Sequence, residues 1–154
     1  RKTRDLSHIR PVAYYGCLLT RPPDVMQFDE CEYPLSMDTV LRAVGIETLD
    51  WSAKTDCCGA ALSLSETEVV LDLTRAILGE ARAAGANAIA VACPLCHVNL
   101  DARQPEVDAK FGTAYGIPIF YFSQLVALAL GAAPEEVGLG RHLVYPRPLL
   151  ATTG

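Results

Sequence analysis

The chain has 154 residues and a formal net charge of -5, with 51% hydrophobic and 20% charged residues. This length and composition are typical of one globular domain with its own core, not of a disordered chain. The acidic balance argues against nucleic acid as the main partner, because phosphate backbones require a basic surface. No stretch approaches the roughly 20 apolar residues of a membrane-spanning helix. The charged start does not resemble a signal peptide, so we expect a cytoplasmic protein without membrane contact.

Apolar runs and breaker residues predict alternating strands and helices. Residues 88–92 are apolar at every position, as expected for a central parallel strand covered on both faces. Gly45, Gly85 and Gly131 follow predicted helices, and glycine is a common residue just past a helix end. In chain order, the expected elements are strand 12–15, loop 18–33, helix 35–44, strand 46–51, loop 54–61, helix 65–84, strand 88–92, a helix opening at Pro94, strand 117–122 and helix 123–130.

This alternation predicts a three-layer α/β fold of the flavodoxin or Rossmann type. A four-stranded parallel sheet would carry helices on both faces, joined by right-handed crossovers. We expect the cysteine-rich domain to occupy residues 11–133. An N-terminal extension (1–10) and a C-terminal tail (134–154) would flank it.

Five of the six cysteines follow predicted strands. Cys17 follows the first strand, Cys57 and Cys58 follow the second, and Cys93 ends the third and forms a C-x-x-C pair with Cys96. Because the carboxyl ends of parallel strands meet at one edge of a sheet, we expect these thiols to converge. In a core-rich chain of this length, converging thiols favour a metal or redox site over a disulfide framework.

The adjacent cysteines favour an iron–sulfur cluster over a single ion. Structural zinc takes four tetrahedral ligands, whereas five cysteines converge here, and the side chains of Cys57 and Cys58 diverge as neighbours. A cluster with several irons offers sites over a larger volume. Gly59 would let the backbone approach a bulky group, and a helix N-terminus at Pro94 would stabilise nearby thiolates. Buried, inert thiols are the alternative.

The spacing C-x39-C-C-G-x33-C-x-x-C resembles that of the cysteine-rich "CCG" domain. This domain occurs in the B subunit of heterodisulfide reductase, in glycolate oxidase iron–sulfur subunits and in lactate-utilisation proteins. The 33-residue gap is slightly shorter than is usual in the family. Further segments are similar to the heterodisulfide reductase B subunit in particular, namely residues 14–22, 56–60, 92–96, 99–101, 121–125 and 142–144 with Pro146.

The resemblance implies a noncubane 4Fe-4S cluster with five cysteine ligands. The cysteines that match the motif position by position are Cys17, Cys57, Cys58, Cys93 and Cys96. It also implies that the chain corresponds to the C-terminal domain of the B subunit alone. The implied activity is that of a disulfide oxidoreductase, which carries electrons to a small heterodisulfide. Subunits C and A of a heterodisulfide reductase-like complex would supply the electrons.

Several alternatives remain open. Residues 93–97 also match the C-x-x-C-H pattern of c-type haem attachment, and a C-x-x-C after a strand is thioredoxin-like. Neither pattern explains Cys17, Cys57 and Cys58. A zinc-binding structural or interaction domain is the non-enzyme alternative, and zinc is expected where the protein is expressed without cluster assembly. An electron-transfer subunit of a glycolate or lactate oxidase-type complex would share the same cysteine pattern.

Four further side chains carry weaker hypotheses. His97 either donates a hydrogen bond or a proton beside the cluster or lies on a helix face. Lys54 and Arg21 either balance the charge of the cluster or are solvated. Cys31 stands between two glutamates that disfavour its thiolate, so we expect it not to be a ligand. Core packing is expected for the strand aromatics, which are Tyr14, Tyr15, Trp51, Phe120 and Tyr121.

Overall fold

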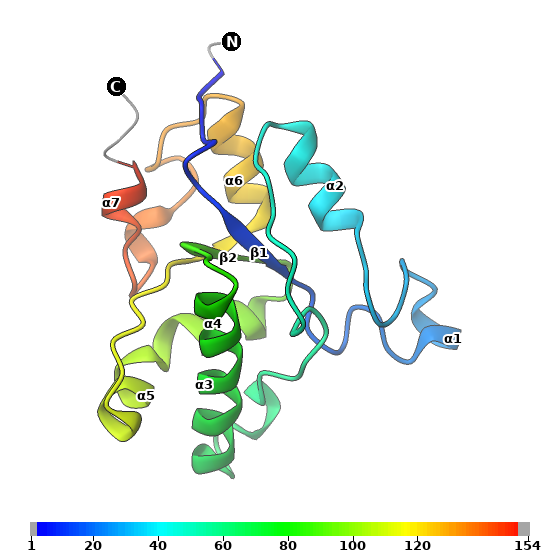
Figure 1. Cartoon of the computed structure of the whole chain (residues 1–154), viewed down its shortest axis with the longest axis vertical. Helices are drawn as coiled ribbons and strands as arrows, with labels where there is room; N and C mark the ends of the chain where they lie inside the picture. Colours follow the sequence, from blue (N-terminus) through cyan, green and yellow to red (C-terminus); the bar gives the residue numbers. More distant parts are fainter. Residues whose placement is uncertain (1–2, 151–154) are drawn as a thin grey trace.

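Three parallel strands form the sheet of the molecule (Figure 1). They are β1 (Pro11–Tyr14), β2 (Ala88–Val91) and β3 (Ile119–Tyr121), in the order β1-β2-β3. Val12 pairs with Ile89, which in turn pairs with Ile119. The computed structural model describes residues 3–150. The strands predicted over 12–15, 88–92 and 117–122 are therefore confirmed, with shifted ends.

Seven α-helices and two 3-10 helices occur within the described residues. They are α1 (Pro23–Met26), α2 (Ser36–Ala43), α3 (Thr67–Ala83), α4 (Pro94–Ala102), α5 (Gln104–Phe111), α6 (Phe122–Ala129), α7 (Arg147–Leu150), η1 (Ala60–Leu62) and η2 (Leu139–Arg141). The helices predicted over 35–44, 65–84 and 123–130 and the helix opening at Pro94 are all present. No helix in this part of the chain is both long and apolar enough to cross a membrane.

The strand predicted over 46–51 is reduced to one parallel bridge, between Leu49 and Val12. The Leu49 amide donates to the Pro11 carbonyl at 2.9 Å, but the ladder stops there. The indole N–H of Trp51 donates to the Ala13 carbonyl at 2.9 Å, so a side chain takes an acceptor that a longer ladder would offer to a main-chain amide. A four-stranded sheet and a flavodoxin-like layering are therefore not confirmed.

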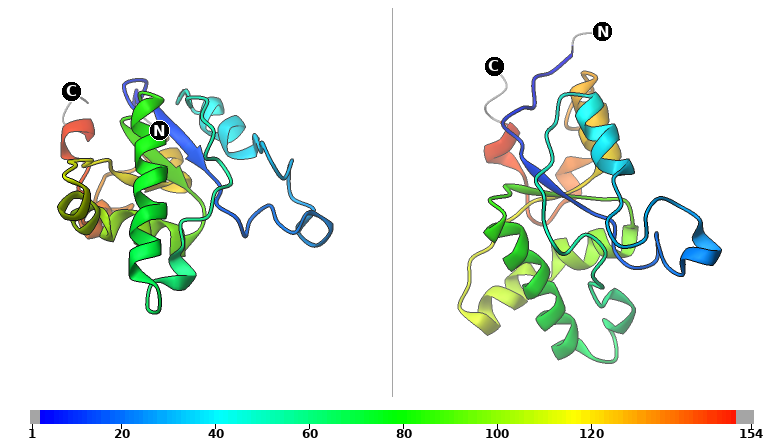
Figure 2. Two further views of the ribbon diagram at one scale, coloured as in Figure 1. Left: turned by 60° about the horizontal axis from the view of Figure 1, so that its bottom comes forward. Right: turned by 45° about the vertical axis from the view of Figure 1, so that its right-hand side comes forward.

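Alternate residues of the strands enter two separate cores. Tyr14 and Ile89 lie in a cluster with side chains of α3 and α4, whereas Ala13, Ala90 and Phe120 lie in a cluster with side chains of α2 and α6. Helices consequently cover both faces of the sheet, as the views in Figure 2 show. This two-sided burial explains why the strands are apolar at every position.

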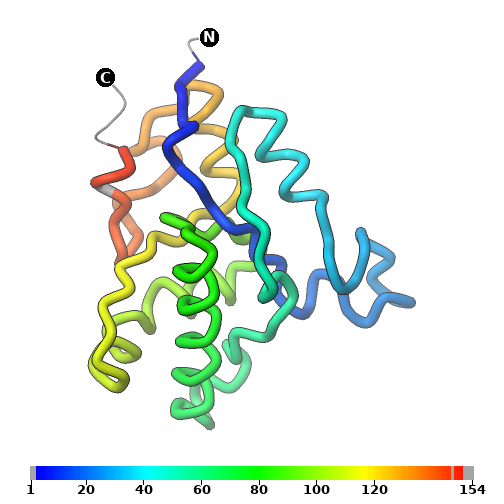
Figure 3. The backbone as a smooth tube through the Cα atoms, in the orientation of Figure 1, coloured from blue at the N-terminus to red at the C-terminus, as the bar shows by residue number. Residues whose placement is uncertain are grey.

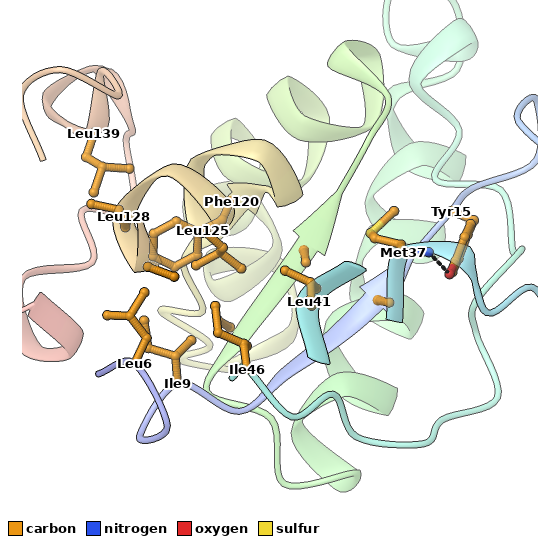
Figure 4. Close-up of a cluster of buried hydrophobic side chains, with 14 residues drawn as sticks. Leu6, Ile9, Tyr15, Met37, Leu41, Ile46, Phe120, Leu125, Leu128 and Leu139 are labelled. Atoms are coloured by element: carbon orange, nitrogen blue, oxygen red, sulfur yellow. Dashed lines mark hydrogen bonds between the residues drawn. The ribbon is translucent and has the colours of Figure 1, made fainter. Parts of the chain in front are cut away.

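The terminal segments take part in the core on the α2 and α6 side (Figure 4). Leu6, Ile9 and Leu139 are buried there beside Leu125 and Leu128. Residues from the predicted extension (1–10) and tail (134–154) thus pack against the main body. The boundaries of the three predicted segments stay predictions.

Residues 18–33, which we call the projecting segment, leave the body after β1 and return to it before α2. In Figure 3 the segment is the loop at the right-hand side, and it carries α1 at its tip (Figure 1). Sequence breakers predicted a loop here, and the structure adds one short helix that opens at Pro23. Cys17 directly precedes this segment, and Pro34 directly follows it.

Candidate metal centre

Three loops bring cysteines together at the edge of the sheet where the strands end. Cys58 Sγ and Cys96 Sγ lie 3.6 Å apart, although 38 positions separate them in the chain. The turn after β1 also contacts this pair, because a Cβ on Gly16 would stand 3.1 Å from Cys96 Sγ. The turn that precedes Cys17 therefore packs directly on a cysteine of α4, as the strand order predicted.

Hydrogen bonds and electrostatic interactions connect all five predicted thiols. Burial, and then a hydrogen bond with Cys57, raises the pKa of Cys17. The hydrogen bond with Cys58, followed by burial and by Cys93, raises the pKa of Cys96. The same hydrogen bond from Cys96 lowers the pKa of Cys58 to about 6. The connected set thus runs from Cys17 and Cys57 through Cys58 to Cys96 and Cys93.

The thiols range from the interior to the surface. Cys58 and Cys96 are buried, with exposed fractions of 3% and 7%. Cys17 and Cys93 are half-buried, and Cys57 is exposed. One side of the thiol set is consequently embedded in the domain, and the side that carries Cys57 faces solvent.

The loop that carries Cys57 and Cys58 is held by contacts from three elements. The hydroxyl of Tyr14 in β1 donates to the Asp56 carbonyl at 2.6 Å. The amide of Asn99 in α4 donates to the Cys58 carbonyl at 3.0 Å. Gly59 has φ +75°, and a Cβ there would stand 2.9 Å from Leu73 Cδ1 of α3. The glycine of the C-C-G motif thus allows the close approach of a helix, and sequence reasoning had assigned that approach to a bulky bound group.

The C-x-x-C pair opens α4, as expected. Cys93 is the N-cap residue and Pro94 occupies the first helical turn, where its missing amide hydrogen costs no hydrogen bond. The His97 amide donates to the Cys93 carbonyl at 3.0 Å, which closes the first turn. Cys93 and Cys96 therefore lie at the N-terminal end of the helix, where free amides and the helix dipole favour negatively charged sulfur.

The donor set is sulfur throughout and fits an iron–sulfur cluster. Cysteine thiolates are the usual ligands of such clusters, and five of them are brought together from three loops. Within residues 3–150, no group of three or more His, Cys, Asp and Glu side chains is arranged to hold a metal ion. The residues that would hold a cluster are the five connected cysteines.

His97 is buried on the side of β3. Its ring stacks on Tyr121, with centroids 4.3 Å apart and planes 5° apart, and its Nε2 lies 3.1 Å from the Ile119 carbonyl. The ring of His142 approaches edge-on at 4.8 Å, and burial lowers the pKa of both histidines. His97 is therefore a packed core residue on one face of α4, which agrees with the helix-face alternative. A role beside the cluster stays a hypothesis.

Tyr121 is an aromatic neighbour of the thiols that sequence reasoning had assigned only to core packing. Burial, and then the proximity of Cys93, raises the pKa of its hydroxyl. Its position at the end of β3, at the same edge as Cys93 after β2, is the sequence signal that could have shown it. The other predicted core aromatics are buried, namely Tyr14, Tyr15, Trp51 and Phe120.

Lys54 is neither solvated nor directed at the thiols. Its exposed fraction is 0%, and its Nζ lies 2.9 Å from Asp38 Oδ2. Arg21 donates to Glu32 at 2.6 Å and to Thr55 at 3.3 Å. Both basic residues therefore have acidic partners within the chain, and the expectation that Lys54 is a solvated loop lysine is wrong.

Cys31 lies in the projecting segment, apart from the connected set. Its Sγ is 3.7 Å from a carboxylate oxygen of Glu30 and 3.9 Å from one of Glu32. Desolvation, and then these carboxylates, raises the pKa of its thiol. The two glutamates therefore disfavour the thiolate of Cys31, as expected.

Comparison with known proteins defines the class. The family model of the cysteine-rich domain, CCG, matches residues 12–101, which is more than half of the chain and includes all five connected cysteines. The chain belongs to this family. The predicted resemblance to the CCG domain is confirmed.

The similar proteins are subunits of redox complexes. The chain is 34% identical over 145 residues to the B subunit of the ferredoxin/F(420)H(2)-dependent CoB-CoM heterodisulfide reductase of Methanosarcina acetivorans, and 33% identical over 145 residues to the B subunit of the ferredoxin:CoB-CoM heterodisulfide reductase of Methanosarcina mazei. Each match covers 93% of this chain and 48% of the relative. The 8-methylmenaquinol:fumarate reductase membrane anchor subunit of Wolinella succinogenes is 28% identical over 141 residues, which is 92% of this chain and 50% of the relative.

The chain thus spans about half the length of the curated relatives it matches. The family is a cysteine-rich one, and the relatives at 33–34% identity are named as subunits of heterodisulfide reductases.

Proposed function

We propose that the chain binds a noncubane 4Fe-4S cluster and passes electrons to a small disulfide within a heterodisulfide reductase-like complex. The five ligands would be the connected cysteines Cys17, Cys57, Cys58, Cys93 and Cys96. The observation that carries the proposal is the convergence of these thiols from three loops at one sheet edge, with Cys58 and Cys96 in contact. The similarity to two heterodisulfide reductase subunits supports the disulfide as electron acceptor.

The buried and the exposed cysteines of the chain would have different roles, the former holding the cluster and the latter lying where a substrate reaches it. The cluster, when bound, supplies one-electron redox chemistry that no amino-acid side chain here offers. Cys58 and Cys96 are buried and would anchor its inner side. Cys57 is exposed, so the side of the site next to Cys57 is the side that a substrate would reach.

Electron balance requires more than this domain. Reduction of one disulfide to two thiols consumes two electrons and two protons, whereas one such centre supplies one electron at a time. Because the chain spans about half of its relatives, we propose that a second CCG domain supplies the second centre. Subunits similar to the C and A subunits of heterodisulfide reductases would deliver the electrons.

The Wolinella relative favours a second candidate. That relative is a membrane anchor subunit of a quinol:fumarate reductase and not of a disulfide reductase. The same cysteine-rich domain would then pass electrons between a quinol and another subunit. In this case no disulfide is reduced, although the cluster and its ligands are the same.

A reoxidation experiment separates the two candidates. The anaerobically purified, reduced chain is mixed with bis(2-hydroxyethyl) disulfide or with a soluble menaquinone analogue, and the visible absorption and the released thiol are followed. We expect the disulfide to restore the visible absorption of the oxidised cluster in wild type and in the Cys31→Ser control, with two reduced chains oxidised for each disulfide cleaved to two thiols. In Cys58→Ser no cluster absorption should return, and any thiol released there comes from exchange with free cysteines. Reoxidation by the quinone alone would favour the second candidate.

A further inference from the structure

Lys54 contacts both ends of the projecting segment. Its main-chain carbonyl accepts hydrogen bonds from the Tyr15 amide at 2.8 Å and from the Gly16 amide at 3.1 Å, just before the segment begins. Its Nζ donates to the Pro34 carbonyl at 3.0 Å, where the segment ends. One residue therefore joins two points of the chain that are 18 positions apart, and Cys17 lies between them.

The charge of Lys54 is balanced inside the protein. Asp38 and Lys54 are each 1% exposed at the side chain, with 2.9 Å between Oδ2 and Nζ. Asp38 also accepts from the Tyr15 hydroxyl at 2.8 Å and from the Thr48 hydroxyl at 2.6 Å. The Tyr15 hydroxyl in turn accepts from the Met37 amide at 2.8 Å, which Figure 4 shows as a dashed line. These bonds connect the end of β1, α2 and the loop before Cys57 in one network.

Stability alone does not account for such a pair. Replacing a buried ion pair by apolar side chains of similar volume is often neutral or stabilising, because desolvation offsets the attraction between the charges. The hydrogen bonds of Lys54 instead fix the relative positions of the segments that they join, because each bond has a preferred direction and reaches a different segment of the chain. One of these segments is the turn at Gly16, whose amide donates to the main-chain carbonyl of Lys54 and which packs against Cys96 Sγ.

We propose that Lys54 is a positioning residue, which holds both ends of the projecting segment and so fixes Cys17 opposite Cys57 and Cys96. This inference rests on the proposed function only in so far as Cys17 is a cluster ligand. Lys54 does not act by its charge, because Asp38 neutralises it within the same pocket. The role thus differs from the expectation that Lys54 balances the charge of the cluster.

The test compares three variants of the full chain. Lys54→Met keeps the main-chain carbonyl but removes the Nζ bonds to Pro34 and Asp38. Lys54→Met/Asp38→Asn removes both buried charges at nearly constant volume, so it retains a folded chain if the single variant does not fold. Lys110→Met is the control, because it removes a lysine that pairs with Glu68 and Asp72 between α5 and α3.

The first readout is the reactivity of Cys17 in the metal-free, reduced chain. Iodoacetamide labelling is followed by mass spectrometry, with Cys31 as the internal reference. If Lys54 positions Cys17, local opening of the turn raises its labelling rate about tenfold in the double variant and leaves it unchanged in Lys110→Met. A Cys17 rate that stays at the wild-type value in every Lys54 variant would overturn the positioning role.

The second readout is the electron paramagnetic resonance spectrum of the cluster-loaded chain. We expect the spectrum of the double variant to shift toward that of Cys17→Ser, because both lose the same ligand. A wild-type spectrum in the double variant would contradict the inference. If wild-type protein assembles no cluster, the proposed function fails while the labelling experiment still decides the role of Lys54.

Discussion

At the scale of single residues, the buried thiol pair has an unequal distribution of charge. The hydrogen bond with Cys96 lowers the pKa of Cys58 to about 6, while the same contact raises the pKa of Cys96. In the metal-free chain, the contact therefore favours ionisation of Cys58 over ionisation of Cys96. A pre-ionised buried thiolate is suited to bind a metal centre, because the thiolate is the ligand form of cysteine.

Replacing Cys96 tests this distribution. In the metal-free chain, thiolate absorption near 240 nm should titrate with a pKa of about 6 in wild type. In Cys96→Ala the hydrogen bond is gone, so the pKa of Cys58 should rise toward its ordinary value. Cys58→Ser should abolish the low-pH titration altogether. A titration that survives in Cys58→Ser would show that another thiol carries the charge.

Substitution of Gly16 by alanine should affect the metal centre as well as stability, because this glycine has both a positive φ and a cysteine close to it. Gly16 has φ +69°, and an added Cβ would meet Cys96 Sγ at 3.1 Å, whereas Gly45 has φ +82° and open space around it. Both Gly16→Ala and Gly45→Ala should lower the free energy of unfolding by about 1–2 kcal/mol, because alanine is strained in the left-handed backbone conformation. Only Gly16→Ala should also displace a thiol of the connected set.

Iron content and urea unfolding of these two glycine variants separate strain from displacement. We expect similar unfolding midpoints and a lower iron content in Gly16→Ala alone. Equal iron content in both variants would mean that the turn after β1 does not matter for the metal centre.

At the scale of elements, α4 holds two of the loops together. Asn99 donates to the Cys58 carbonyl at 3.0 Å and to the Thr74 hydroxyl at 3.1 Å, and its Oδ1 lies 3.3 Å from the Ser63 hydroxyl. The helix that begins at the C-x-x-C pair therefore also fixes the Cys57–Cys58 loop and contacts α3. This side chain is a second link between cysteine loops, independent of the thiols themselves.

Asn99→Ala should destabilise the chain by about 1–3 kcal/mol, because it leaves the buried carbonyl of Cys58 without its donor. Val98→Ala is the matched control on the same helix, since Val98 is 62% exposed and surface changes usually stay within about 0.5 kcal/mol. Urea unfolding of both variants measures the difference. Equal free energies of unfolding would show that the Asn99 bonds are replaced by water.

The elements also show what the sequence could predict. The strand over 88–92 was predictable because it is apolar throughout, and that reflects burial on both faces. The strand predicted over 46–51 does not form, because the indole N–H of Trp51 donates to the Ala13 carbonyl that would otherwise continue the ladder. A local apolar pattern cannot show this competition. The convergence of the five cysteines followed from strand order alone. The ion pair of Lys54 depends on a partner 16 positions away, so local pattern could not show it.

At the scale of the whole molecule, the two buried histidines make stability depend on pH. Burial lowers the pKa of His97 and of His142, so the unfolded chain binds protons that the folded chain does not. Stability is therefore complete above the ordinary histidine pKa of about 6.5 and falls as pH drops below it. The slope is at most about 1.4 kcal/mol per pH unit for each histidine.

Urea unfolding of the metal-free chain at pH 7.0 and pH 5.5 measures this dependence, and His142→Gln should reduce the loss of stability between the two values. Cys58, whose pKa is also lowered in the folded chain, makes stability rise with pH as well. Its contribution is the same in variant and wild type, so it cancels when the two losses of stability are compared. An unchanged loss in His142→Gln would assign the pH dependence to other groups.

The metal content of the purified chain decides whether the five connected cysteines hold an iron–sulfur cluster. Iron, zinc and acid-labile sulfide are measured on anaerobically purified wild type, Cys58→Ser and Cys31→Ser. We predict about four irons and four sulfides per chain in wild type and in Cys31→Ser, and a clear loss of both in Cys58→Ser. About one zinc per chain with neither iron nor sulfide would contradict the account and favour a structural metal domain.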